Sequence, residues 1–472
     1  MSDRPLPQNA NSTRITRYVL VLIIVTIYIG AGTRLFRKSS WTLYSTVYSR
    51  MAEGFAAGHL YMPTQAPVEL LNLENPYDRL RNWNIITDPK INIWDLSLFE
   101  GRLYAYFGVV PTLVAFLPYR LVTGTALDDG LAAILFLSIA FAIASQLLFE
   151  IKDKHFSKTP EWMLLTSVVF LSVLNFSATI LKHPFVYEVA IAGGLCFGLA
   201  SILSLNRFFD NSNNKLSSLG LSSLYAGLAF GCRPVYVMYV PVLMFAVAGS
   251  FIALKNINQR LKFLFALFLP LGIIFAGLGA YNYSRFGSPF DFGWHYQLNG
   301  FNVFAQSPLE ISRLAVGLYY LLLHQVHIVS TFPYVDFSVA APSWLTVPPE
   351  YLAETAAGLL VVVPYFSVGL ISALICVVLV REKYVSIFPI REFLIVFLTG
   401  ILAMCFIAAH ISSAIRYHCD IESYLILAAT ICRLTLDQLL ITRPRYRNVM
   451  RAVWLITGFV SAAIVTAVGL AS

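Results

Sequence analysis

The chain has 472 residues, of which 58% are hydrophobic, 14% aromatic and 12% charged. A soluble globular chain carries about 25% charged residues, so this composition excludes a soluble enzyme and a disordered protein. Six cysteines in so long a chain also exclude a disulfide-stabilised secreted scaffold. The net charge of +8 needs no nucleic-acid partner, because membrane proteins concentrate Lys and Arg in cytoplasmic loops. We therefore expect an all-α, polytopic membrane protein.

The chain opens with a polar segment, residues 1–17, which is too long for the charged start of a signal peptide and is predicted to be a cytoplasmic tail. The first membrane span is expected at 18–36, and residues 18–472 are expected to form one membrane domain. A helix of about 20 apolar residues crosses a bilayer. Ten further runs of this kind bring the expected number of spans to about eleven: 131–149, 161–181, 185–204, 217–231, 234–254, 262–282, 356–380, 393–410, 422–440 and 452–471.

A twelfth run, 104–122, is interrupted by Gly108, Pro111 and Pro118. If it dips into the membrane and returns, and the N-terminus is cytoplasmic, the short cytoplasmic loops hold most of the Lys and Arg residues, as the positive-inside rule requires. Two long loops, about 37–130 and 283–355, then lie outside. The opposite topology, with the N-terminus outside and the first loop inside, is disfavoured because the loop carries only seven Lys or Arg between Arg37 and Leu103. The expected location is the inner membrane of the cell.

The first long loop begins with small and apolar residues at helical spacing, about 43–57, which predict an amphipathic helix in the membrane interface. The rest of the loop is rich in turn-forming residues. Its candidate acids for catalysis are Glu53, Asp78, Asp88, Asp95 and Glu100. For each of them, the alternative is a solvated or ion-paired surface acid.

The second long loop contains aromatic side chains interleaved with polar ones between Arg285 and Gly300. Aromatic rings stack on the apolar faces of a pyranose, and polar side chains bond its hydroxyl groups. Trp294, His295 and Asp291 are therefore candidates for binding a sugar. The alternative is an aromatic belt at the membrane interface.

A metal site has little support in the sequence. His324 and His327, with Asp336 further along, lack a firm carboxylate partner, and the cysteines show no CxxC spacing. No cofactor is expected, and a divalent metal is unsupported.

Charged residues at the membrane edge are costly and often functional. Arg233 lies at an outer helix junction, and the segment from His410 to Glu422 joins two spans on the same face. Arg416 has the planar donor geometry that binds phosphate through two hydrogen bonds, with Arg233 or His410 as helpers. The alternative is that Arg416 pairs with Asp420 or Glu422 and fixes a helix end.

Several stretches resemble a known superfamily. The first span is followed by a long outer loop with AEGFAAGHLYM, then by a short Pro-containing run, VVPTLVAFLPYRLVTG, and then by a span that ends in basic residues. This layout resembles the GT-C superfamily of integral membrane glycosyltransferases, and more narrowly the bacterial relatives of protein mannosyltransferases and of lipid A aminoarabinose transferases. The stretches KHPFVYEVAIAGG, NYSRFGSPFDFGWHYQLNG and AIRYHCDIESYLILAA are similar to parts of bacterial members.

The resemblance implies transfer of a sugar, with inversion, from a polyprenyl-phosphate or polyprenyl-pyrophosphate carrier to a lipid, glycan or protein acceptor outside the cytoplasm. A carboxylate of the first outer loop is the usual base in that superfamily. The acidic pair that normally follows the first span would fall near Tyr44 and Ser45, where this chain has no acid. The expected roles are therefore Asp95, then Asp78, as base; Arg416, Arg233 and His410 as phosphate ligands; and Trp294, His295 and Asp291 in the sugar pocket.

Three other functions remain open at this level. A glycan polymerase or ligase would use the same carrier. A transporter or flippase of a lipid-linked glycan would be expected to carry charges in mid-span and to show repeated halves, whereas the spans here are almost free of charge; the clearest exception, Arg433, lies toward the cytoplasmic end of its run. The third alternative is an inactive relative that retains the fold.

Overall fold

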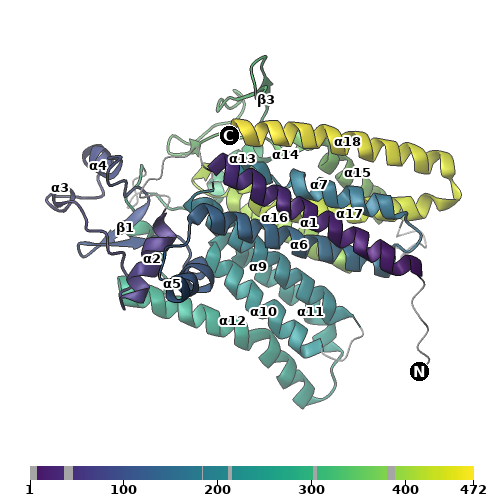
Figure 1. Cartoon of the computed structure of the whole chain (residues 1–472), viewed down its shortest axis with the longest axis horizontal. Coiled ribbons are helices and arrows are strands. Elements are labelled where there is room, and N and C mark those ends of the chain that lie inside the picture. Colours follow the sequence, from purple (N-terminus) through teal and green to yellow (C-terminus); the bar gives the residue numbers. More distant parts are fainter. Residues whose placement is uncertain (1–7, 37–45, 183, 211–214, 301–305, 380–387) are drawn as a thin grey trace.

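The computed structural model describes residues 8–36, 46–182, 184–210, 215–300, 306–379 and 388–472, and it is a bundle of long helices (Figure 1). Eight helical segments in these ranges are long and apolar enough to cross a membrane. The prediction of an all-α polytopic membrane protein is therefore confirmed. The segments contain α1 (Gln8–Phe36), α6 (Asp129–His155), α9 (Val186–Phe209), α11 (Tyr239–Ile252), α12 (Ile257–Phe286), α16 (Ile390–Ala408), α17 (Glu422–Leu439) and α18 (Pro444–Ala471).

The remaining three predicted spans are shorter helices. α10 (Lys215–Cys232) occupies one of them. The prediction of one helix over 161–181 is wrong, because the chain turns at Phe176, whose φ is 56°, and divides the segment into α7 (Glu161–Leu174) and α8 (Ser177–Lys182). The run 356–380 is likewise divided, into α14 (Leu359–Val362) and α15 (Pro364–Leu379).

The core of the bundle lies around α9, which packs between α6 and α10. The side of α9 that faces Tyr236 and Tyr424 carries Gly198. A Cβ atom at this position would come within 2.3 Å of the Tyr424 hydroxyl oxygen, so only glycine allows the close approach. Small residues serve the same purpose wherever helices pack closely in membranes.

The interrupted run 104–122 forms no helix long enough to cross a membrane. It forms β2 (Arg102–Ala105), a π-helical turn, η2 (Thr112–Phe116), and α5 (Leu117–Thr123). The twelve helical residues are about 18 Å long, and a hydrocarbon core is about 30 Å thick. The run packs against helix α2 (Val47–Ala56), where Tyr48 contacts Phe107 and Phe116. Ser49 of α2 donates to the carbonyl of Leu127, just after the run.

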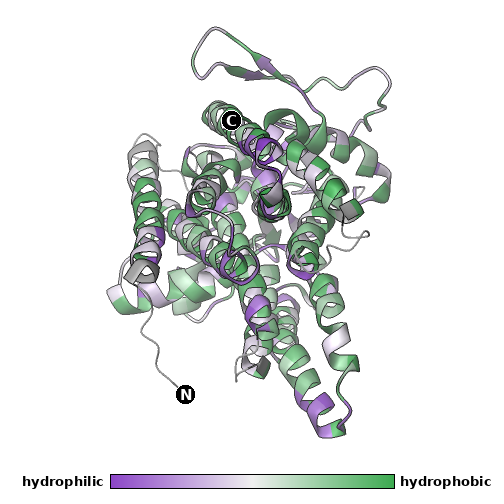
Figure 2. Ribbon diagram, turned by 90° about the vertical axis from the view of Figure 1, so that its right-hand side faces the viewer, coloured by the Kyte–Doolittle hydropathy of each residue, from purple (hydrophilic) through white to green (hydrophobic). Residues whose placement is uncertain are grey.

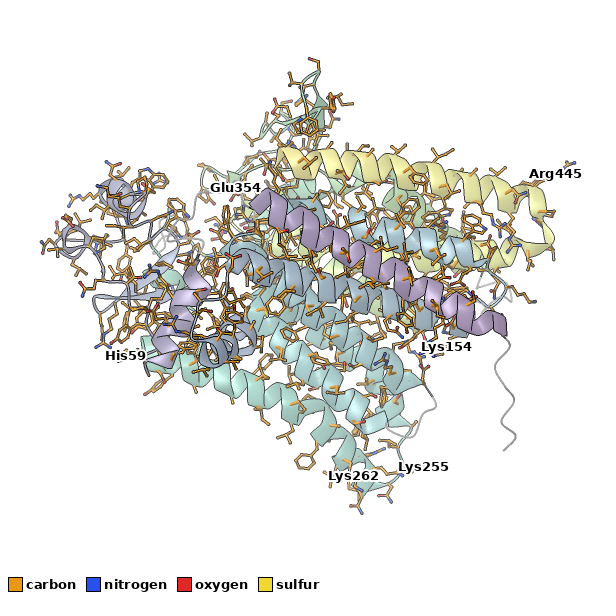
Figure 3. The ribbon with its side chains drawn as sticks, viewed as in Figure 1. His59, Lys154, Lys255, Lys262, Glu354 and Arg445 are labelled. Atoms are coloured by element: carbon orange, nitrogen blue, oxygen red, sulfur yellow. The ribbon has the colours of Figure 1, made fainter. Side chains whose placement is uncertain are left out.

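Basic and acidic side chains join the helix ends at one end of the bundle. Arg17 pairs with Asp153 and Glu161, Lys154 pairs with Asp210 and Glu392, and Arg447 and Arg451 pair with Asp437. Lys154, Lys262 and Arg445, in α6, α12 and α18, and Lys255, between α11 and α12, lie at this end of the bundle, away from His59 and Glu354 (Figure 3). The loops predicted to share the cytoplasmic face thus lie together in the structure, and we call this end the basic end.

The two long loops meet at the opposite end of the bundle. In the first loop, α3 (Val68–Leu71) and α4 (Arg79–Ile86) precede β1 (Leu96–Phe99), which pairs antiparallel with β2 so that Leu96 faces Ala105. The second loop extends this hairpin: Ser97 bridges to Gln297, and the amide of Leu298 donates to the carbonyl of Leu96 over 2.8 Å.

The rest of the second loop returns to the bundle through η5 (Ile311–Arg313) and α13 (Leu314–Leu322). A hairpin of β3 (Val326–Ile328) and β4 (Val335–Phe337) follows and projects sideways beyond α18, as both ribbon views show (Figures 1 and 2). The loop then forms β5 (Leu352–Ala353), which pairs in parallel with β6 (Ser412–Ser413).

Candidate functional site

Asp95 lies where the two long loops and α9 meet. Its backbone has φ 61°, a conformation that Asp and Asn tolerate better than most residues, and its side chain is only 7% exposed. One carboxylate oxygen, Oδ1, accepts a hydrogen bond from Nε2 of Gln297 over 3.0 Å. The other, Oδ2, accepts one from the hydroxyl of Tyr187 in the first turn of α9.

The environment of Asp95 shifts the pKa of its carboxyl toward neutral pH. Burial raises the pKa of this carboxyl to about 6, while the hydrogen bond from Tyr187 and the positive charge of Arg416 act in the opposite direction. The negative charge of Glu354 acts in the same direction as burial. A carboxylate with a pKa close to the working pH is mostly ionised and still basic enough to accept a proton.

Arg416 faces the same region from η7 (Ile415–Asp420). Its two terminal nitrogens donate to the two carboxylate oxygens of Glu354 over 2.6 and 3.0 Å, and its guanidinium carbon lies 4.6 Å from the ring centroid of Tyr187. The amide of Glu354 donates to the carbonyl of Ser413, so the pairing of β5 with β6 brings the two partners together. The expected alternative, an ion pair of Arg416 with Asp420 or Glu422, is wrong.

Those two acids pair deeper in the protein. Asp420 is fully buried and lies 3.0 Å from Arg233, and Glu422 lies 2.6 Å from His418. Burial raises the pKa of Asp420 to about 6, and Arg233 opposes this shift. The guanidinium of Arg233 is also 5.7 Å from the ring of Tyr417. Arg233 therefore lies close to the Arg416 segment, with its charge balanced by a buried carboxylate.

His410 lies beside the same group of side chains. Its ring meets Tyr417 edge-on, with the centroids 5.8 Å apart, and its Nδ1 is 3.1 Å from Oγ of Ser412. Burial, together with the positive charges of Arg233 and Arg416, lowers the pKa of His410 to about 4. The imidazole is therefore neutral at pH 7 and offers a hydrogen bond but no charge.

The three residues expected in a sugar pocket are divided between two environments. Trp294 is buried, packs against Ile411 and Tyr106, and donates through Nε1 to the carbonyl of Gln306 over 3.1 Å. His295 is exposed, with Nδ1 3.5 Å from Oδ2 of Asp291. Trp294 thus lies against the segment that carries His410, whereas His295 lies at the surface of the loop.

The side chain of Asp78 caps the first turn of α4. Its Oδ1 accepts a hydrogen bond from the amide of Leu80 at the start of α4, and its other oxygen lies 3.6 Å from Arg81. Both contacts lie within the first loop. Tyr44 and Ser45, where the sequence lacks the expected acidic pair, are outside the described residues.

Sequence reasoning missed three residues of this site: Tyr187, Gln297 and Glu354. Tyr187 and Gln297 lie within stretches that carried the resemblance, but no local pattern marks them as partners of Asp95. Glu354 had no signal at all. Within the described ranges, no three His, Cys, Asp or Glu side chains are grouped to hold a metal ion. A hollow of about 470 Å³ lies elsewhere, on the outer face of α1 from Arg14 to Leu22.

Comparison with known proteins gives one structural match. No protein-family profile fits the chain, and no curated protein matches it. Among solved structures, the chain is similar to the archaeal oligosaccharyltransferase AglB from Archaeoglobus fulgidus, determined in complex with an inhibitory peptide and a dolichol-phosphate. The identity is 12% and the TM-score 0.44, over 94% of this chain and 56% of that one.

Proposed function

We propose that this chain is a membrane glycosyltransferase that moves a sugar from a polyprenyl-phosphate carrier to a glycan, lipid or protein acceptor outside the cytoplasm. The observation that supports this function best is the buried carboxylate of Asp95, which has a pKa of about 6 and lies within the electrostatic influence of Arg416. An inverting transfer needs a base next to a cation that stabilises a departing phosphate.

In this mechanism Asp95 accepts the proton of the acceptor hydroxyl while the acceptor oxygen attacks the anomeric carbon. The bond from that carbon to the phosphate oxygen breaks, and its electron pair leaves with the carrier phosphate. Arg416 stabilises the negative charge, oriented by Glu354 and by the ring of Tyr187. Its Nε is buried and has no hydrogen-bond partner among the described residues.

The surrounding residues supply binding surface. Arg233 and the neutral His410 lie close enough to Arg416 to help hold the phosphate, and Trp294 offers an aromatic wall beside them. His295 and Asp291 form the outer rim where the sugar or acceptor enters. The basic end then faces the cytoplasm, in accordance with the positive-inside rule, and the site faces the outer side of the inner membrane.

The test is transfer of radiolabelled sugar from polyprenyl-phosphate donors by the protein reconstituted in liposomes. Asp95→Asn suits this test because Asn also tolerates a positive φ. We expect it to lower the transfer rate about 100-fold or more, the usual contribution of a general base. Glu74→Gln is the matched control, because Glu74 is an exposed acid of the same loop with 90% of its side chain accessible; this variant should retain activity.

Two results would contradict the assignment. If Asp78→Asn abolishes transfer while folded Asp95→Asn retains it, the base is Asp78. If no donor in a broad panel supports transfer and the protein moves the carrier between leaflets instead, the chain is a transporter.

A further inference from the structure

The hairpin of β3 and β4 exposes large apolar side chains. Ile328 is 89% exposed, Phe332 73% and Tyr334 56%. Trp344, a few residues after the hairpin, is 70% exposed. From Val326 to Trp344 the sequence carries a single carboxylate, Asp336, and one histidine, His327. Such a concentration of exposed apolar surface marks an interaction site rather than an ordinary loop.

The base of the hairpin is fixed to the protein. Val335 and Phe337 pack against the main hydrophobic core, and β4 contacts α18. Nε2 of His324 bonds the carbonyl of Ser338, and the hydroxyl of Tyr320, on α13, donates to the carbonyl of Val339 over 2.8 Å. The apolar tip of the hairpin, which carries Ile328, Phe332 and Tyr334, is therefore held in a defined position.

This position is at the side of the bundle, close to the C-terminal end of α18. The ribbon views show the hairpin beyond α18, on the outer flank of the helices (Figures 1 and 2), whereas the first loop with α3 and α4 extends from the end of the bundle. The other end of α18 carries Arg445, at the basic end (Figure 3). The hairpin is thus level with the membrane boundary on the side of the protein where Asp95 lies.

We propose that the hairpin tip inserts into the outer interface of the lipid bilayer and anchors the second long loop there. Trp and Tyr side chains are enriched at the boundary between lipid and water, and both types are exposed here, beside the apolar ring of Phe332. The hairpin lies against α18, which β4 contacts and on which the apolar side chains of Ile456 and Phe459 are 62% and 61% exposed. Contact with a helix that exposes apolar side chains and is long enough to cross a membrane favours lipid over a second protein as the occupant.

The anchor has a consequence for the site. The loop that carries the hairpin also carries Glu354, which orients Arg416. Anchoring the loop in the interface holds these residues at the depth where a lipid-linked phosphate presents its head. The insertion itself follows from exposure and position alone, and does not depend on the proposed reaction.

A fluorescent probe placed on single cysteines tests the insertion. Ile328→Cys is labelled with an environment-sensitive NBD group in full-length protein reconstituted in phosphatidylcholine and phosphatidylglycerol liposomes. Ile456→Cys, on α18, is the lipid-exposed reference, and Leu80→Cys, on α4 and 84% exposed, is the water-exposed reference. The native cysteines are buried or half-buried, and labelling of the unsubstituted protein measures their background.

We expect the Ile328→Cys probe to emit at shorter wavelength than the Leu80→Cys probe and to be quenched by lipids with a nitroxide near the headgroup. Emission and quenching equal to those of the Leu80→Cys probe would overturn the proposal, and would leave a protein partner as the occupant of the hairpin. The readout is independent of sugar transfer, so failure of the anchor and failure of the proposed function are distinguished.

Discussion

At the scale of single residues, Asp95 is balanced between two opposing effects. Removal from water disfavours its charged form, and the two hydrogen bonds from Tyr187 and Gln297 favour it. Burial prevails, so the pKa is raised to about 6. A carboxylate that acts as a base must be ionised, and its activity should therefore respond to pH near this value.

The pH dependence of sugar transfer follows from this balance. We expect kcat/KM to fall as the pH is lowered through about 6, because protonated Asp95 cannot accept a proton. In Tyr187→Phe the carboxylate of Asp95 loses a hydrogen-bond donor that lowers its pKa. The acid limb of the profile, where kcat/KM falls as the pH is lowered, should therefore move to higher pH. The ring that packs under Arg416 is retained in this variant.

Tyr77→Phe is the matched control for that shift, because the Tyr77 hydroxyl donates to the carbonyl of Leu98 instead of to a carboxylate. Its acid limb should stay where it is in the unsubstituted protein. An acid limb that does not move in Tyr187→Phe, or a flat profile between pH 5 and 8, would show that Asp95 is not the titrating base.

The sequence identified the charged residues of this region more readily than their partners. The sequence indicates Arg233, His410 and Arg416 as candidate functional residues, because placing charged groups at a membrane edge costs free energy. Gln297 is 202 residues from Asp95 in the chain, and Glu354 is 62 residues from Arg416. Such pairs depend on how two loops cross in space, and no local spacing encodes that crossing.

At the scale of helices and strands, hydropathy located the helices but not their breaks. The mean hydropathy of a window of about 20 residues does not reveal a break at Asn175 and Phe176. The helix ends there because the side chain of Asn175 accepts a hydrogen bond from the amide of Ser177. The prolines of the run 104–122 gave a clearer signal, since proline removes a backbone donor. The break in the run 104–122 was therefore predictable, whereas the break at Asn175 and the break before Pro364, between α14 and α15, were not predicted.

The packing of α13 on α16 controls the position of the His410 segment. A Cβ atom at Gly317 would come within 2.0 Å of the carbonyl oxygen of Ala408, in the last turn of α16. Backbone cannot yield as a side chain can, so Gly317→Ala should destabilise the protein by about 1–3 kcal/mol. We expect a lower midpoint of thermal unfolding in detergent and a lower transfer rate.

Gly272→Ala is the comparison for this substitution, because the space around Gly272 in α12 is open and alanine favours helix more than glycine does. Its unfolding midpoint should equal or exceed that of the unsubstituted protein. Equal midpoints for the two variants would show that the contact between α13 and Ala408 is looser than described.

At the scale of the whole molecule, the two ends of the bundle differ in the role of their charges. At the basic end, ion pairs such as Arg17 with Asp153 and Glu161 join neighbouring helix ends. At the other end, the charged side chains of Asp95, Arg416 and Glu354 lie where the two long loops meet. Sequence composition predicted this division through the loop charges, but the site itself required the tertiary structure.

The difference in charge between the two ends of the bundle predicts the orientation of the protein in the membrane. If the basic end faces the cytoplasm, a cysteine in place of Leu80, in the first long loop, should react with a membrane-impermeant maleimide in intact spheroplasts. A cysteine in place of the exposed Lys262 should react only after the membrane is permeabilised. The opposite pattern would place Asp95 in the cytoplasm, where the donor would be a soluble nucleotide sugar or a carrier of the inner leaflet, and the proposed reaction would then be wrong. Reaction of both cysteines in intact spheroplasts would indicate leaky membranes or mixed orientation, which a cytoplasmic marker protein distinguishes.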